Sequence, residues 1–143
     1  MRPSEIRPDL VLKEILEGNL VLQTSETEFA DIKVYAQGER PNIGLDSEFV
    51  EIMFNGLIRS VTKPIGFVKG NLAIGIYVKT YQDGSVFGYR VQKLEELIQE
   101  LVSDVTAKGF FFSFNLDSII TPTTVNTTTG YSQTILNVEW HTV

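Results

Sequence analysis

The sequence contains no cysteine and a single histidine in 143 residues. The absence of cysteine excludes disulfide bonds, thiolate metal sites and cysteine nucleophiles. The one histidine, His141, cannot build the usual histidine-rich zinc site, although carboxylate sites for Mg²⁺ or Ca²⁺ stay open. No stretch approaches the roughly 20 apolar residues that span a bilayer, and residues 1–10 lack the apolar core of a signal peptide. We therefore expect no membrane partner and synthesis in a cytoplasm.

Positive charge is also scarce, because 12 Lys and Arg face 18 Asp and Glu and leave a net charge of −6. Proteins that bind nucleic acid tightly need clustered cations that displace counterions from phosphates. The acidic balance argues against such a surface, but it is compatible with a surface past which nucleic acid slides. The length and the 43% hydrophobic content predict one domain over residues 1–143 with a real core. Residues 1–7 are expected to be flexible.

Residues 70–109 carry the clearest pattern in the sequence. Residues 71–80 alternate between apolar and other side chains, as expected of a strand with one buried face. From about Ser85, a possible N-cap, the apolar residues recur at three- and four-residue steps, which predicts a long amphipathic helix. Lys108 and Gly109 are good signals for the end of that helix. The helix is expected to lay its apolar stripe on the sheet that contains the preceding strand.

The remaining elements complete a small α+β pattern. A helix should begin at Pro8 and end at Gly18-Asn19, and strands over residues 29–37 and 49–57 should form an antiparallel hairpin with a long polar loop at 38–46. Residues 63–68 read as an edge segment or a loop because of Pro64. Strands are expected at 110–116 and 131–142, joined by a threonine-rich connector at 117–130. The predicted fold is a single α+β domain with two helices on a mostly antiparallel or mixed sheet of about five strands, in α-β-β-β-α-β-β order.

For each residue that could take part in catalysis or binding, an ordinary structural role explains the sequence pattern at least as well. His141 lies near the end of a strand and is expected at the surface rather than in a catalytic triad. The loop at residues 83–88 joins a strand to a helix, but it matches neither phosphate-binding glycine pattern. The carboxylates on the long helix, Glu95, Glu96, Glu100 and Asp104, are expected to form a solvated face, and the run at 110–114 is expected in the core. We predict no catalytic, cofactor-binding or metal-binding residue, and no enzymatic activity.

The chain combines an N-terminal helix, a long-looped hairpin, the strand NLAIGIYVKT, the helix RVQKLEELIQELV and two closing strands that end in ILNVEW. This order of elements resembles the tail terminator and neck proteins of long-tailed bacteriophages. The most similar block is IYVKTYQDGS followed by YRVQKLEELI. The likeness covers most of the chain as a pattern of elements.

The resemblance implies a virion structural protein of the tail or neck. Such a subunit assembles with itself as a ring, typically a hexamer, which caps the tail tube and joins it to the head-side connector, while DNA passes through the lumen without specific binding. No catalytic residue or cofactor is implied. We expect the contacts to involve the two long loops and the apolar segment at 63–68, that is Arg40, Pro41, Asn42, Ile43, Ile65, Phe67, Ile119, Ile120 and Val125. The alternatives are a related neck or tail-completion protein, and a small cytoplasmic ligand-binding or enzymatic domain that uses residues 83–88.

Overall fold

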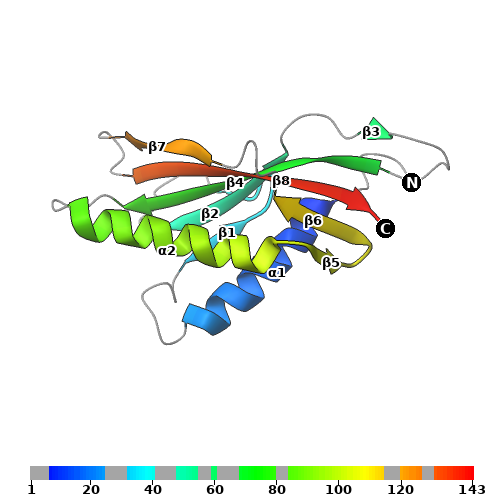
Figure 1. Cartoon of the computed structure of the whole chain (residues 1–143), viewed down its shortest axis with the longest axis horizontal. Coiled ribbons are helices and arrows are strands. Elements are labelled where there is room, and N and C mark those ends of the chain that lie inside the picture. Colours follow the sequence, from blue (N-terminus) through cyan, green and yellow to red (C-terminus); the bar gives the residue numbers. More distant parts are fainter. Residues whose placement is uncertain are drawn as a thin grey trace.

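The computed structural model describes residues 7–24, 32–40, 48–54, 59–60, 68–79, 84–114, 120–126 and 131–143. Within these ranges the chain forms a single α+β domain, as predicted. Its elements are α1 (Pro8–Thr24), β1 (Lys33–Tyr35), β2 (Phe49–Phe54), β3 (Arg59–Ser60), β4 (Val68–Lys79), α2 (Gly84–Val102), β5 (Val105–Ala107), β6 (Phe110–Phe114), β7 (Ile120–Asn126) and β8 (Tyr131–Thr142). Both helices lie on the same side of one sheet (Figure 1).

The sheet is built around the long strands β4 and β8. Its main strand order is β1-β2-β4-β8-β6-β5, with β3 paired to β4 and β7 paired to β8. The antiparallel β4–β8 pairing runs from Lys69 opposite His141 to Lys79 opposite Tyr131. The other edge of β8 is shared, because β7 pairs with its first half and β6 with its second half. Every described pairing is antiparallel except β1–β2.

The core lies between the helices and one face of this sheet. The alternation predicted for residues 71–80 is confirmed, since Leu72, Ile74, Ile76 and Val78 are all buried. Their partners on β8, the even-numbered residues from Ser132 to Trp140, are buried on the same face. The apolar stripe of α2 packs against them, and its buried members are Val91, Leu94, Ile98 and Val102. Alternation on the strands and helical periodicity on α2 therefore bury a common core.

The first departure from the predictions concerns β1 and β2, which are parallel and not an antiparallel hairpin. Lys33 lies opposite Phe49 and Tyr35 opposite Glu51. After β1 the chain turns at residues 36–39, where the Glu39 N–H donates to the Ala36 carbonyl at 3.0 Å and Gly38 has a φ of 80°. A parallel partner requires the chain to run back to its starting end. Residues 41–46 of the loop predicted at 38–46 lie outside the described residues, and the number of residues between β1 and β2 is compatible with parallel pairing.

The second departure is the end of the long helix. α2 ends at Val102, and residues 105–107 form β5 in place of a last helical turn. Lys108 and Gly109 have φ values of 47° and 85° and connect β5 to β6. Two successive residues with positive φ are typical of a type I′ hairpin turn. Gly109 takes positive φ as expected, but the turn that needs it is a hairpin and not a helix end.

Two further segments also differ from the predictions. α1 does not end at Gly18-Asn19 but continues to Thr24, because a glycine inside a helix costs only about 1 kcal/mol and can be overridden by packing. The threonine-rich connector contains the strand β7, which pairs with β8. Threonine and other β-branched residues favour strands, and Pro122 is accommodated where the register shifts between Thr121 and Thr124.

Candidate functional site

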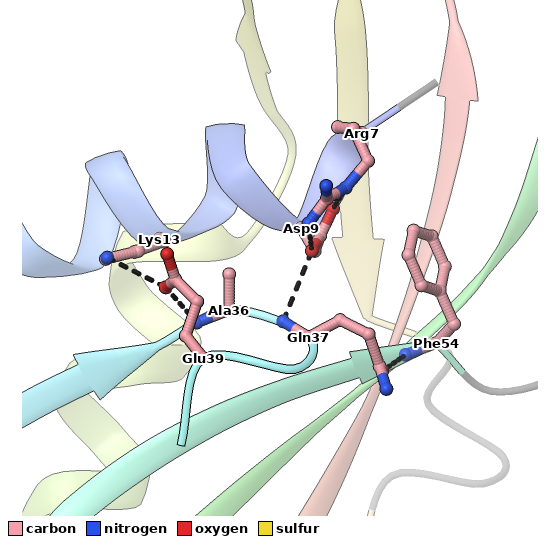
Figure 2. A network of polar contacts seen from close by, with 7 residues as sticks. All are labelled: Arg7, Asp9, Lys13, Ala36, Gln37, Glu39 and Phe54. Carbon is pink, nitrogen blue, oxygen red and sulfur yellow. Dashed lines mark hydrogen bonds and ion pairs between the residues drawn. The ribbon is translucent and has the colours of Figure 1, made fainter. Parts of the chain in front are cut away.

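A network of polar contacts joins α1 to the turn that follows β1 (Figure 2). Asp9, in the first turn of α1, has a fully buried carboxylate that accepts from Arg7 Nε at 3.0 Å and Nη2 at 2.8 Å. The same carboxylate accepts the Gln37 backbone N–H at 3.2 Å. The Gln37 side-chain oxygen in turn accepts the Phe54 N–H at the end of β2, at 2.8 Å. One buried carboxylate therefore links the start of α1 to the loop that carries the chain toward β2.

Glu39 anchors the other side of this turn. Its Oε1 accepts from Lys13 Nζ and from the Ala36 backbone N–H, both at 2.8 Å. The hydrogen bond from Lys13 and that from Ala36 hold the pKa of Glu39 below its usual value of 4.5. The bond to Glu39 likewise raises the pKa of Lys13. The turn is thus fixed to α1 by an ion pair that forms fully only when Glu39 is ionised.

This ion pair predicts a small dependence of stability on pH. Because the folded pKa of Glu39 is lowered, its contribution is complete above pH 4.5 and is lost as the pH falls through the folded value. Glu39→Gln should lower the free energy of unfolding by about 0.5 kcal/mol at pH 7, since the pair is largely exposed. The difference between the variant and the parent should shrink as the pH falls below 4.5 and through the lowered pKa of Glu39. Urea unfolding over an acidic pH series measures this, and a difference that does not shrink with falling pH would contradict the ion-pair explanation.

An open cleft lies beside the network, between α1 and β1. It has a volume of about 490 Å³ and is lined by Lys13, Glu17, Ile32, Lys33, Val34, Tyr35 and Glu39. Four of these residues are consecutive in and around β1. Successive side chains of a strand point to opposite faces, so a cleft lined by all four runs along the edge of β1 rather than over one face. The cleft therefore borders the end of the sheet.

Aromatic side chains gather on the sheet face opposite the helices. The rings of Phe49 and Tyr77 stack with centroids 4.4 Å apart, and Tyr35 meets Phe49 edge-on at 5.9 Å. The guanidinium of Arg40 lies over both stacked rings, 5.8 Å from Phe49 and 5.9 Å from Tyr77. Its Nε also lies 3.4 Å from a carboxylate oxygen of Glu51, a residue that is buried on this face. Such cation–π and stacked geometry gives the patch a fixed shape.

The structure places only some of the residues predicted at interfaces. Arg40 belongs to the aromatic patch, and Ile120 and Val125 lie on strand β7. Pro41, Asn42, Ile43, Ile65, Phe67 and Ile119 lie outside the described residues. The structure therefore brings Arg40 onto one sheet face and puts Ile120 and Val125 on a strand at the opposite edge from β1.

The candidates for chemistry are dispersed. The ring of His141 lies against that of Phe111, with centroids 5.1 Å apart and planes tilted by 31°, and its Nδ1 lies 2.9 Å from the Thr142 carbonyl oxygen. Burial and the charge of Glu96 raise the pKa of Glu95 on α2. Asp83 and the rest of the loop before α2 lie outside the described residues. α2 begins at Gly84, so Ser85 lies inside the helix and is not its N-cap. Within the described ranges, no three His, Cys, Asp or Glu residues gather as metal ligands, and no described helix is long and apolar enough to cross a membrane.

Sequence reasoning missed the residues of the polar network. Asp9, Gln37 and Glu39 look like ordinary surface residues in the sequence, because each stands in a polar stretch. One signal was present, since an acidic residue directly after Pro8 suits the first turn of a helix. The burial of Asp9 depends on Gln37, 28 positions away, and no local pattern reports that contact.

Comparisons with known proteins extend the description of the fold. No family model matches the chain, and no curated protein matches it. Eight chains of solved structures match. One of them aligns with a TM-score of 0.54 and 14% identity, over 92% of this chain and 93% of the other, and its name gives no activity, ligand or partner. At this identity the similarity shows a shared fold over nearly the whole length.

Proposed function

We propose that this chain is a structural subunit of a bacteriophage tail or neck, of the tail terminator kind, that works by assembling into a ring. The observation that carries the proposal is the one-sided sheet. Both described helices cover the same face (Figure 1), while on the opposite face Phe49, which is only 2% exposed, stacks with Tyr77 beneath the exposed Arg40. Aromatic residues and arginine are the residues that protein interfaces favour.

The family resemblance supplies the rest of the proposal. The α+β class and the two helices fit the subunit that the resemblance implies, whereas the parallel β1–β2 pair replaces the hairpin of that pattern. The partners are then other copies of this chain, the tail tube and the head-side connector, and the place of action is the virion. The net charge of −6 supports passage of DNA through the lumen, since a negative wall repels phosphates.

Ring assembly is tested by the mass of the protein in solution. Light scattering behind size exclusion, over a concentration series, should show a species of several 16.1 kDa subunits, with six expected. Arg40→Glu should raise the concentration needed for assembly at least tenfold if the aromatic patch takes part, because it reverses the charge of the exposed side chain that lies over both rings. Lys93→Glu, on α2, is the matched control for the change of charge. A 16.1 kDa species at every concentration would contradict the proposal.

A further inference from the structure

Two strands at opposite ends of the sheet, β1 and β7, each have an outer edge with no described strand partner. β1 pairs on one side with β2, and no described strand pairs with its other edge. β7 pairs on one side with β8, and its outer edge is also without a described partner. These two edges lie on opposite sides of the β2-β4-β8 strands. Unpaired edges present backbone N–H and C=O groups that can accept another strand.

The edge of β1 is accessible because the cleft runs along it. Ile32 and Val34 form the apolar floor of the cleft, and α1 forms its far wall. The charges that line it are balanced, since Lys13 and Lys33 stand against Glu17 and Glu39. Lys13 already contacts both carboxylates, at 3.9 Å from Glu17 and 2.8 Å from Glu39. A neutral groove of this kind suits an uncharged strand better than a charged one.

β7 is an uncharged strand of seven residues, ITPTTVN. Natural edge strands are usually protected from pairing by charges, proline or bulges. β7 has such protection only in its first half, where Pro122 and the register shift between Thr121 and Thr124 lie. Its second half, Thr124 to Asn126, is regular and carries no charge. That half has three residues, the same length as β1.

We infer that residues 124–126 of one copy add as a strand to the outer edge of β1 of the next copy and occupy its cleft. The inference rests on the proposed function, because it names the contact that builds the proposed ring. Pairing between opposite edges is head-to-tail, so each added copy presents a new β1 edge for another copy. A head-to-tail contact closes into a ring when the rotation between copies divides a full turn. Pairing of β1 with itself would instead stop at a dimer.

The absence of cysteine allows a direct test by disulfide cross-linking. We would combine Lys33→Cys on β1 with Thr124→Cys, Val125→Cys or Asn126→Cys on β7, one at a time, and add a mild copper–phenanthroline oxidant. Successive side chains of a strand point to opposite faces. The yield of cross-linked multimers should therefore differ at least fivefold between position 125 and its neighbours 124 and 126. Lys33→Cys with Thr106→Cys, an exposed position on β5, is the matched control and should give no ladder.

The results separate this inference from the proposed function. A reducible ladder of multimers with period two along β7 supports the strand addition. Rings seen by light scattering without any β1–β7 ladder overturn the strand addition and leave the ring. A ladder in particles of open-ended mass supports the strand addition and overturns the closed ring. Monomers without a ladder, or equal ladders from the β5 control, overturn the inference.

Discussion

Replacing Trp140 by alanine should lower the free energy of unfolding by about 4 kcal/mol, the cost of emptying a fully buried aromatic site. The indole is 1% exposed and lies in the core beside the edge of Phe110, with ring centroids 5.7 Å apart. It also lies flat against Gly70, where an added Cβ would come within 2.9 Å of the ring. Gly70 therefore leaves the space that the indole fills, and alanine at 140 would leave a cavity bounded by backbone. Urea unfolding followed by circular dichroism measures the loss.

Two companion variants make the Trp140 result specific. His141→Ala changes the neighbouring residue on the opposite face, which stacks on Phe111 and is half-buried, and should cost about 1 kcal/mol. Trp140→Phe should cost less than Trp140→Ala, because the buried indole N–H has no hydrogen-bond partner among the described residues and its loss removes an unmet donor. Equal losses for Trp140→Ala and His141→Ala would contradict the assignment of the two faces.

Replacing Asp9 by alanine should lower the free energy of unfolding by about 3 kcal/mol, within the range for breaking a buried charged pair. The change removes the acceptor for Arg7 and for the Gln37 backbone N–H at once. Arg7 can turn to solvent because its side chain is 41% exposed, but the Gln37 N–H loses the buried carboxylate to which it donates. The loss should therefore include loosening of the turn at residues 36–39. Faster amide exchange at Gln37 and Phe54 is the local measurement that accompanies chemical unfolding.

Glu17→Ala is the matched control for Asp9→Ala. Glu17 lies on the same helix and its carboxylate is 3.9 Å from Lys13, but its side chain is 55% exposed. Exposed pairs of this kind contribute about 0.5 kcal/mol or less. If Asp9→Ala costs no more than Glu17→Ala, the Asp9 network does not contribute to stability and the burial of its carboxylate is offset elsewhere.

The parts of the fold that were predictable are those fixed by periodicity over many residues. The alternation of residues 71–80 and the helical repeat from Val91 to Val102 each report a buried face, and a buried face depends on neighbouring residues in the chain. The last strand was predicted at residues 131–142 and is observed as Tyr131–Thr142. The α+β class follows from these elements alone.

The incorrect predictions concern short segments whose secondary structure or direction depends on residues far away in the sequence. Val105 continues the apolar stripe of α2 in sequence, yet it pairs with Phe112 in a hairpin. The direction of β2 relative to β1 depends on the path of the connector, and β7 exists because β8 offers it an edge. The α1–turn network was unpredictable for the same reason, since Asp9 and Gln37 become neighbours only after the sheet has formed. Local propensity cannot report such contacts.

The position of β8 has a consequence for how the chain is made. β4 leaves the ribosome before α2, β5, β6 and β7, but its long antiparallel partner β8 is synthesised after all of them. During that interval the apolar face and one edge of β4 have no partner strand, and contacts of such large sequence separation form slowly. A nascent chain in this state is prone to pair with other chains. Folding of the sheet is therefore expected to finish after β8 has emerged, and production of the protein should depend on chaperones that shield β4 until then.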